Sequence, residues 1–349
     1  MKAAVVVANE DIRYMDIEEP QVTQGTVKVK VAVSGICGSD IPRVLHNGVH
    51  FYPIVLGHEF SGEIVEVGEQ VSSVKVGDRV AGVPLVPCMS CSDCQQGNYA
   101  LCKQYSFIGS RQNGSNADYV VVPERNVVKF DKSVSFEQGA MFEPSTVALH
   151  GVLQNDYRGG GAVAILGAGT IGIFTFQWAK LLGATKVIVF DISDERLALA
   201  EKLGADGTVN TLKENFMEEA LAAAGGSGYD YVFETAGATA TMKIAFKLAA
   251  SKSNVCFIGT PHTELCFTPV EWENMNRKEF GLTGSWMSYS APFPGKEWTM
   301  TAEYYASGRL KFDEGLIGER IPMSEAQEAF QKFKKPGAIK GKLLLVNNL

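Results

Sequence analysis

The sequence predicts an α/β protein of two domains, one mostly β and the other built on a doubly wound parallel sheet. Three observations support this prediction. β-type runs fill residues 1–147, strand-like and helix-like runs alternate over 148–287, and residues 288–349 end in an apolar strand-like run with no helix partner. The third observation assigns 288–349 to the same domain as 1–147.

The first domain reads as short strands separated by Gly, Pro and Asp. Runs such as TVKVKVAV, GEIVEVG and DYVVVPE are rich in valine, which favours the pleated, half-buried surface of a sheet. The closing run GKLLLVNNL has the same character. We therefore expect it to return to the N-terminal strands.

Composition limits the functions to consider. With 349 residues, of which 46% are hydrophobic and 20% charged, the chain can bury two cores. Its formal net charge of −7 gives no sign of a basic face, so nucleic acid is not an expected partner. The start, MKAAVVVANEDIRYMD, has acidic residues after its apolar run and no cleavage pattern. No signal peptide is expected, and the expected location is cytoplasmic, where thiols stay reduced.

An uncharged run of 21 residues, 159–179, opens the second domain. It is long enough to cross a bilayer, but its glycines argue against a membrane span, and no membrane partner is expected. Residues 162–166 read as a buried strand and 171–182 as a helix, with the motif G-x-G-x-x-G between them at Gly167, Gly169 and Gly172.

A second strand, 186–190, ends at Asp191, nineteen residues after Gly172. This spacing fits a dinucleotide site in which glycines admit the pyrophosphate, the helix N-terminus supplies N–H groups, and the acid accepts the ribose hydroxyls. The acid would repel a 2′-phosphate and no arginine follows it directly, so NAD is favoured over NADP. The expected cofactor-binding residues are Gly167, Gly169, Thr170, Ile171, Gly172 and Asp191.

Alternation continues beyond this unit. Helices are predicted over 195–203, 216–224 and 238–250, and strands over 229–233 and 254–258. Strands that alternate with helices in this way are typical of a doubly wound parallel sheet.

Four cysteines crowd one short segment in the spacing C-x2-C-x2-C-x7-C: Cys88, Cys91, Cys94 and Cys102. A metal site, a disulfide knot and a redox centre are the alternatives. Reduced thiols argue against disulfides, and the short gaps let four thiolates surround one zinc ion. Such a site is closed and structural, so metal-dependent chemistry would need a second, open site.

The segments SGICGSD, VLGHEFSG and FEPSTVALH offer Cys37, His58, Glu59 and Glu143 for that open site. Sulfur, nitrogen and oxygen donors together suit zinc. The alternative is a core cysteine, a core histidine and a surface acid. Gly57 and Gly62 flank the His-Glu pair, and we expect them to turn the backbone sharply.

These motifs together resemble the zinc-dependent medium-chain dehydrogenases, over essentially the whole chain. GHEFSGEIVEVGEQV is similar to their catalytic-zinc signature, the four-cysteine segment to their structural zinc and GAGTIG to their nucleotide fold. The resemblance implies a GroES-like catalytic domain (1–147 and 288–349), a Rossmann domain (148–287), two zinc ions per chain, and a homodimer or homotetramer.

Site roles follow from the resemblance. It implies that Cys37, His58 and one or both of Glu59 and Glu143 hold a catalytic zinc ion, and that Ser39 is the first proton acceptor. The cysteines of 88–102 would hold the structural ion. The family's relay histidine, five residues after the zinc cysteine, is replaced by Pro42, so proton exit must take another path.

Within the family the chain is most similar to the polyol dehydrogenase branch, through CGSDIPRVLHNGVHFYPIVLGHEFSG, FIGSR, FEPSTVALH and GSWMSYSAPFPGKEW. The implied reaction moves a hydride from a secondary hydroxyl of a polyol or polyol phosphate to NAD, with galactitol 1-phosphate as the favoured substrate. Arg43, where sorbitol dehydrogenases of this branch place a tyrosine, and Arg111 are the candidates for binding phosphate. Alternatively, Arg43 is an exposed arginine paired with a nearby acid.

One departure concerns residues 114–119, which read GSNADY where relatives usually read GGFAEY. A pocket-side aromatic would then be missing, which would leave room for a different or larger polyol. Two rival functions stay open: a sorbitol-like, iditol-like or threonine-type dehydrogenase of uncharged substrates, and a non-catalytic zinc and nucleotide binder. The intact set of Cys37, Ser39, His58 and Asp191 argues against the second.

Overall fold

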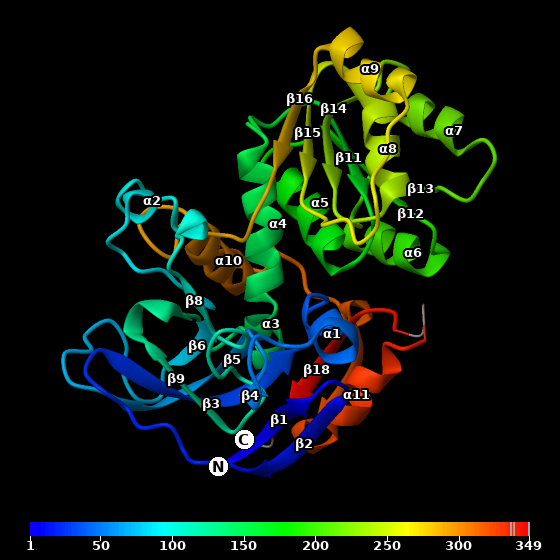
Figure 1. The fold of residues 1–349 in the computed structure, drawn as a ribbon. Coiled ribbons are helices and arrows are strands. Elements are labelled where there is room, and N and C mark those ends of the chain that lie inside the picture. The colour runs from blue at the N-terminus through cyan, green and yellow to red at the C-terminus, as the bar shows by residue number, and fades with distance from the viewer. Residues whose placement is uncertain (336, 338, 348–349) are drawn as a thin grey trace. The chain divides into compact units, whose positions relative to one another are not determined.

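The computed structural model describes residues 1–335, 337 and 339–347. The chain forms two compact units, one of Met1–Glu143 with Tyr289–Leu349 and the other of Pro144–Ser288 (Figure 1). The division made from the sequence fell at 147/148 and 287/288. In both divisions the middle of the chain forms one unit, and its two ends share the other.

The first unit is built on a sheet with the strand order β10-β6-β5-β3-β18-β17, in which β9 also pairs with β3. The C-terminal strand β18 runs antiparallel to β3, with Leu344 opposite Gly35, so the apolar tail does join the N-terminal strands. Residues 348 and 349 of that tail lie outside the described residues. The strands are β3 (Thr26–Gly35), β5 (Glu59–Val67), β6 (Arg79–Gly82), β9 (Tyr119–Pro123), β10 (Val127–Lys129), β17 (Ile317–Pro322) and β18 (Lys342–Val346).

Alternation along β3 explains where its core lies. Val27, Val29 and Val31 point to one face and pack with Phe60 and Ile64 of β5. A smaller sheet, β2-β1-β4, completes the unit together with short elements. These are β1 (Lys2–Ala8), β2 (Asp11–Asp16), β4 (Ile54–Val55), β7 (Leu85–Val86), β8 (Ser106–Phe107), α1 (Asp40–Pro42), α2 (Ser92–Gln95), α3 (Phe136–Ala140), α10 (Lys296–Ala306) and α11 (Ala326–Lys332).

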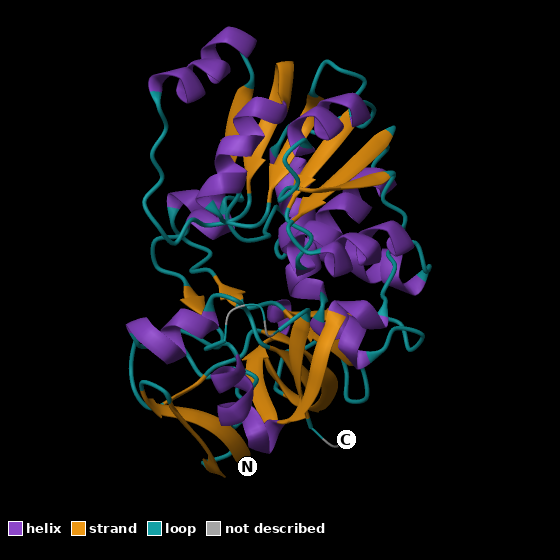
Figure 2. Ribbon diagram, turned by 90° about the vertical axis from the view of Figure 1, so that its right-hand side faces the viewer, coloured by secondary structure: helices purple, strands orange, loops and turns teal. Residues whose placement is uncertain are grey.

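The second unit contains a six-stranded, all-parallel sheet in the order β13-β12-β11-β14-β15-β16, with helices against both faces (Figure 2). This confirms the predicted doubly wound sheet, whose strand order reverses between β11 and β14. Its elements are β11 (Ala162–Leu166), α5 (Thr170–Leu181), β12 (Lys186–Asp191), α6 (Asp194–Leu203), β13 (Gly207–Asn210), α7 (Phe216–Ala223), β14 (Tyr229–Glu234), α8 (Thr239–Leu248), β15 (Ala249–Phe257), α9 (Pro269–Lys278) and β16 (Gly281–Gly284). Helix α4 (Phe142–Gln154) begins at the end of the first unit and continues into the second.

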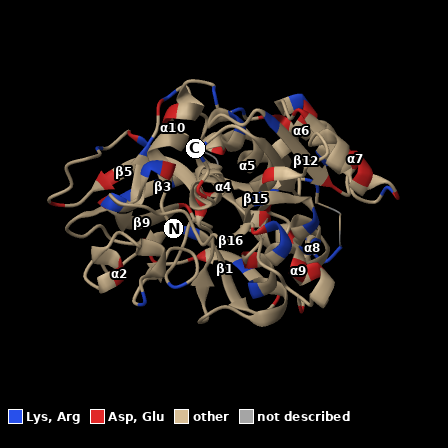
Figure 3. Cartoon of the chain, turned by 90° about the horizontal axis from the view of Figure 1, so that it is seen from above, with Lys and Arg blue, Asp and Glu red and all other residues tan. Residues whose placement is uncertain are grey.

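The uncharged run 159–179 forms β11 and most of α5, and is buried because the strand lies in the middle of the sheet. Across the residues that the structure describes, there is no helix with both the length and the apolar character needed to span a membrane. Acidic and basic side chains both occur on α6 and α9 (Figure 3), and Lys243 of α8 forms an ion pair with Glu271 of α9.

Candidate metal centres and cofactor site

The four cysteines of 88–102 meet in space. One ligand atom from each of Cys88, Cys91, Cys94 and Cys102 lies within 4.8 Å of the others. Helix α2 places Cys91 at its start and Cys94 one turn later, and Sγ of Cys88 lies 3.9 Å from Sγ of Cys94. All seven cysteines of the chain are free thiols. Four thiols at this spacing fit a tetrahedral zinc ion.

Local contacts already prepare these thiols for a metal. Hydrogen bonds from the backbone N–H and hydroxyl of Ser90 lower the pKa of the Cys88 thiol to about 6, and Cys91 N donates to the same sulfur at 3.3 Å. Burial raises the pKa of Cys94 to about 12. Metal uptake at this segment would therefore displace the proton of Cys94.

The cysteine segment 88–102 packs against residues 291–293, which follow Ser288 in the chain. The ring of Tyr99 packs edge-on against Phe293 with centroids 5.2 Å apart. A Cβ on Gly97 would lie 2.7 Å from the Cβ of Ala291, so glycine is needed for this close approach. The segment is thus both a thiol cluster and a packed part of the first unit.

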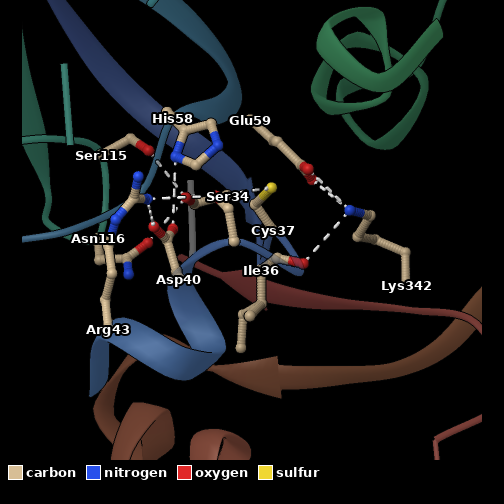
Figure 4. A network of polar contacts seen from close by, with 11 residues as sticks. Ser34, Ile36, Cys37, Asp40, Arg43, His58, Glu59, Ser115, Asn116 and Lys342 are labelled. Carbon is tan, nitrogen blue, oxygen red and sulfur yellow. Dashed lines mark hydrogen bonds and ion pairs between the residues drawn. The ribbon is translucent and has the colours of Figure 1, made fainter. Parts of the chain in front are cut away.

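A second cluster joins Cys37, His58 and Glu59, whose ligand atoms also lie within 4.8 Å of one another (Figure 4). Cys37 follows β3, and the other two residues stand at the start of the neighbouring strand β5, with Gly35 opposite Glu59 in the register. His58 and Glu59 are only 3% and 2% exposed. A thiol, an imidazole and a buried carboxylate fit zinc.

Asp40 lies beside this cluster, and the sequence analysis missed it. Its Oδ2 is 3.3 Å from Nδ1 of His58, and it is 1% exposed. Burial alone would lower the pKa of His58, but Asp40 and Cys37 together raise it well above its usual value. A carboxylate at Nδ1 orients the ring and leaves Nε2 as the ligand atom. The signal was present, because Asp40 stands three residues after Cys37 at the start of a helical turn.

Lys342 is the second residue that was missed. Its Nζ lies 2.7 Å from each carboxylate oxygen of Glu59 and donates to Ile36 O at 3.3 Å (Figure 4). Burial opposes the charge of Lys342, but Glu59 and Cys37 raise its pKa above the usual value. Glu59 therefore belongs to the cluster and to a buried ion pair at once.

Glu143, the fourth predicted ligand, lies in the first turn of α4 and outside the 4.8 Å group. Burial raises its pKa to about 7, an effect that His58 opposes and Glu59 strengthens. Glu143 thus lies within electrostatic reach of the cluster.

Ser39 lies next to Cys37, and Arg43 lies next to Ser39. Ser39 Oγ donates to Cys37 Sγ at 3.3 Å and accepts from Arg43 Nη1 at 3.2 Å. The same Nη1 donates to Asp40 Oδ1 at 2.7 Å, which is the alternative that the sequence analysis left open for Arg43. Both contacts use Nη1, so neither of them occupies the donors on the other two nitrogens of the guanidinium.

Arg111 is exposed and lies over the ring of Tyr105, with its guanidinium carbon 4.7 Å from the ring centroid. Burial lowers the pKa of His50, and the charges of Arg111 and Arg43 lower it further. Both candidate arginines therefore act on the same side chain.

The two glycines expected to turn the His-Glu pair behave differently. Gly57 has φ of +98°, a left-handed conformation that favours glycine. Gly62 lies within β5, where a Cβ would stand 2.1 Å from Lys30 O of β3. The expectation of a sharp turn at Gly62 is wrong, because this glycine permits close strand contact instead.

In the second unit, the predicted cofactor residues gather where β11 meets α5. Gly169 is the N-cap of α5, and Thr170 and Ile171 open the helix. A Cβ on Gly172 would lie 1.8 Å from Gly167 O, so glycine lets the helix approach the strand end. A Cβ on Gly169 would meet no atom within 4 Å, as expected where a ligand approaches the backbone.

Asp191 ends β12 and holds the glycine loop. Its Oδ2 accepts from Ala168 N at 2.7 Å, and its Oδ1 accepts from Ile192 N and Ser193 N at 2.8 and 2.9 Å. From the sequence, Asp191 was expected to accept the ribose hydroxyls and to repel a 2′-phosphate, and its contact with the glycine loop was not foreseen. Oδ1 already accepts two hydrogen bonds, but Oδ2 accepts only one of these three and keeps a second lone pair, so bracing the loop is compatible with accepting a ribose hydroxyl at Oδ2.

Comparisons with known families place both parts of the chain in one enzyme family. Residues 23–132 match the alcohol dehydrogenase GroES-like domain, and residues 170–302 match the zinc-binding dehydrogenase family. The chain belongs to the zinc-dependent medium-chain dehydrogenases. It is therefore an oxidoreductase of alcohols or polyols with a zinc-binding fold.

Three characterised relatives illustrate the branch. Galactitol 1-phosphate 5-dehydrogenase of Escherichia coli (strain K12) is 39% identical over 99% of this chain and 100% of its own length. D-arabitol-phosphate dehydrogenase of Enterococcus avium and sorbitol dehydrogenase of Bacillus subtilis (strain 168) are each 33% identical, over 95% of this chain and 93% of their own lengths.

Solved structures of dehydrogenases are also similar to this chain. The crystal structure of galactitol-1-phosphate dehydrogenase from Escherichia coli superposes with a TM-score of 0.93 at 38% identity, covering 99% of this chain and 100% of that one. A zinc-binding dehydrogenase from Sinorhizobium meliloti 1021, bound to NADP, gives 0.88 at 31% identity, covering 99% of each chain.

Proposed function

We propose that this chain is an NAD-dependent zinc dehydrogenase that oxidises a secondary hydroxyl of a polyol phosphate to the keto sugar phosphate, with galactitol 1-phosphate as the first candidate. The observation that carries the proposal is its full-length similarity to a dehydrogenase of that substrate. A second relative acts on another polyol phosphate. Arg43 and Arg111, which both act on His50, supply the cations that a phosphate requires.

We assign the catalytic metal to Cys37, His58 and Glu59, with Glu143 as a further ligand, and a structural metal to the cysteines of 88–102. Bound zinc would act as a Lewis acid that lowers the pKa of the substrate hydroxyl. Asp40 orients His58, and Lys342 offsets the negative charge of Glu59. Two neighbours with fixed positions thus hold the ligand side chains ready.

Oxidation of an alcohol removes a hydride from carbon and a proton from oxygen. Ser39 is the proposed first acceptor of that proton, since its hydroxyl lies beside Cys37. Arg43 donates to Ser39 Oγ and would favour release of the hydroxyl's own proton to solvent as this oxygen takes the proton of the substrate. Pro42 replaces the relay histidine of relatives, so the proton leaves from Ser39 without a histidine at that position.

We propose NAD as the electron acceptor. The carboxylate of Asp191 stands at the end of β12, where a 2′-phosphate would meet it. Three backbone N–H groups hold this carboxylate in place, so it cannot easily turn away from an approaching phosphate.

Asp191→Ala tests the choice of cofactor. We expect the KM for NAD to rise by about 10–150-fold, the equivalent of a charged hydrogen bond of roughly 1.5–3 kcal/mol, and the preference against NADP to relax. Steady-state kinetics with both cofactors measure this. Asp194→Ala, which removes a neighbouring acid of α6, serves as the matched control. Equal use of NAD and NADP by the unmodified enzyme would contradict the assignment.

Substrate profiling tests the phosphate. We expect kcat/KM with NAD to be highest for galactitol 1-phosphate when it is compared with galactitol, sorbitol and iditol. The phosphate adds charged hydrogen bonds that the uncharged polyols cannot form, and the difference should be at least about tenfold. A preference for any uncharged polyol would overturn the phosphate assignment and leave hydride transfer to NAD untouched.

Arg43→Ala and Arg111→Ala locate the phosphate. For each variant we expect the KM for the phosphorylated substrate to rise by about 10–150-fold, with little change on the uncharged parent. Arg43 also contacts Ser39 and Asp40, so Arg111→Ala is the cleaner test. Arg125→Ala, at another exposed arginine of the first unit, is the control. Equal losses on charged and uncharged substrates would rule out a phosphate contact.

A second candidate function is oxidation of an uncharged polyol, as in the sorbitol dehydrogenase relative, or of an amino alcohol. It is favoured by the contact between Arg43 Nη1 and Asp40, which gives the arginine a structural role that needs no phosphate. The same substrate comparison decides between the two functions.

We further propose that the enzyme is a homodimer or homotetramer and works in the cytoplasm, where its seven free thiols would stay reduced. The edge strand β16 supports self-association, because Leu282 on it and Trp286 just beyond it are 40% and 55% exposed. Light scattering coupled to size exclusion measures the assembly, and a monomer at micromolar concentration would contradict it.

A further inference from the structure

Three buried polar side chains form a hydrogen-bonded series next to the candidate catalytic metal site. Ser34 of β3, Ser115 and Asn116 are 0%, 0% and 3% exposed, and their side chains meet in Figure 4 beside His58. None of the metal ligands predicted from the sequence belongs to this group. Burying three polar side chains is costly unless they bond to one another, so their arrangement requires an explanation.

The hydrogen bonds of this chain have a defined direction. Ser34 Oγ donates to Asn116 Oδ1 at 2.8 Å, which uses the single proton of that hydroxyl. The 2.8 Å contact between Ser34 Oγ and Ser115 Oγ must therefore be donated by Ser115. The series runs from Ser115 through Ser34 to Asn116, and each hydroxyl proton has an acceptor.

All three side chains converge on Gly57, the residue before His58. A Cβ at position 57 would lie 2.3 Å from Asn116 Oδ1, 2.6 Å from Ser115 Oγ and 2.8 Å from Ser34 Oγ. The oxygens thus occupy the space that any other residue's side chain would need. They lock the left-handed turn from which His58 and Glu59 start.

Backbone contacts hold the same turn from the same side. Ser115 N donates to Gly57 O at 3.0 Å, and Asn116 N donates to Leu56 O at 2.9 Å. On the other side of His58, the ring of Phe107 packs edge-on with centroids 5.4 Å apart. His58 is therefore fixed both through its backbone and through its ring.

We infer that Ser34, Ser115 and Asn116 are positioning residues that set the place of His58 relative to Cys37. The turn at Gly57 can move only if these oxygens separate. Its movement would shift two neighbouring ligands of the metal at once. The inference deepens the proposed function and rests on its assignment of Cys37 and His58 as metal ligands.

Residues 114–119, GSNADY, supply both Ser115 and Asn116. The sequence analysis expected a pocket that lacks an aromatic side chain there. In the structure, Asn116 is buried and its Oδ1 accepts from Ser34 Oγ.

The test measures how fast zinc leaves the holoenzyme for a chromophoric chelator. Asn116→Leu keeps the size of the side chain and removes the acceptor of Ser34, while Ser34→Ala removes the oxygen in the middle of the series. We expect release of the metal held by Cys37 to accelerate at least about tenfold in both, because outer partners of metal ligands typically contribute 10–100-fold to affinity. Two zinc ions should be released in two kinetic phases. The phase that Cys37→Ser lacks is the one of the metal held by Cys37.

Asn155→Leu is the matched control, because Asn155 is also buried, at 1% exposure, and bonds to Asn254 O within the second unit. It should lower the melting temperature without changing zinc release. The inference is overturned if zinc release in Asn116→Leu and Ser34→Ala stays within about twofold of the unmodified protein, or if Asn155→Leu accelerates it equally. If Asn116→Leu does not fold, Ser34→Ala carries the test. A second signature is the absorption spectrum of the cobalt-substituted protein, which should shift in both variants and not in the control.

Zinc content and zinc release distinguish a wrong metal site from a wrong positioning role. If Cys37→Ser still holds two zinc ions, Cys37 is not a ligand and the proposed metal site is wrong. If Cys37→Ser loses one ion while Asn116→Leu and Ser34→Ala release zinc at the normal rate, only the positioning role is wrong.

Discussion

Cys37→Ser is expected to give a folded protein with one zinc ion per chain, against the two proposed for the unmodified protein, and with kcat/KM lowered by at least about a thousandfold. A serine hydroxyl is a far weaker zinc ligand than a thiolate, so the open site should lose its metal. Cys37 lies beyond the end of β3 and is only partly buried, so the sheet should be undisturbed. Elemental analysis, steady-state kinetics and thermal unfolding measure the three effects.

Cys266→Ser provides the matched control, because the same exchange is made at an exposed cysteine outside both clusters. It should keep both zinc ions and full turnover. A Cys37→Ser protein that keeps its turnover would mean that the hydride transfer does not depend on this cluster. A protein that unfolds would mean that Cys37 is structural, as the alternative reading of a core cysteine holds.

The second unit was the easier part to predict, because its signals are local. The strand predicted at 162–166 is β11, and the helix predicted at 171–182 is α5 with a shift of one residue at each end. In this region a buried strand, a glycine turn and a helix follow one another directly. Each residue type has a physical reason at its position.

Three elements of the same unit were not predicted. β13 and β16 have only four residues and begin with glycine, so they carry no apolar run or alternation. Helix α9 has no buried residue, so it lacks the apolar stripe by which a helix is recognised. Neighbouring strands define these elements more than their own sequences do.

The candidate metal site likewise contains residues that the sequence predicts and residues that it does not. His58 and Glu59 are adjacent in sequence, and the sequence analysis grouped them with Cys37 by donor type. Lys342 pairs with Glu59 across 283 residues, and only the antiparallel contact of β18 with β3 brings them together. A pair so distant in sequence leaves no local pattern. Asn116 shows the same limit, because its hydrogen bond with Ser34 joins residues 82 positions apart in the sequence.

A second substitution with a large expected effect lies in the cysteine segment 88–102. The packing of this segment indicates that a bound metal would stabilise it. Few apolar residues support this segment, apart from the contact of Tyr99 with Phe293 and the close approach of Gly97 to Ala291. Helix α2 has only four residues and is too short to be stable alone. Bonds from four thiolates to one ion would supply what the apolar contacts do not.

Cys91→Ser should therefore reduce zinc to one ion per chain and lower the melting temperature, by about 2–4 °C for each kcal/mol of metal-linked folding energy lost in a domain of 150–250 residues. Ser90→Ala, which removes only a hydroxyl near Cys88, should keep both ions and most of the stability. Differential scanning calorimetry with zinc analysis compares the two. A Cys91→Ser protein as stable as the unmodified one would show that these thiols do not hold the fold together.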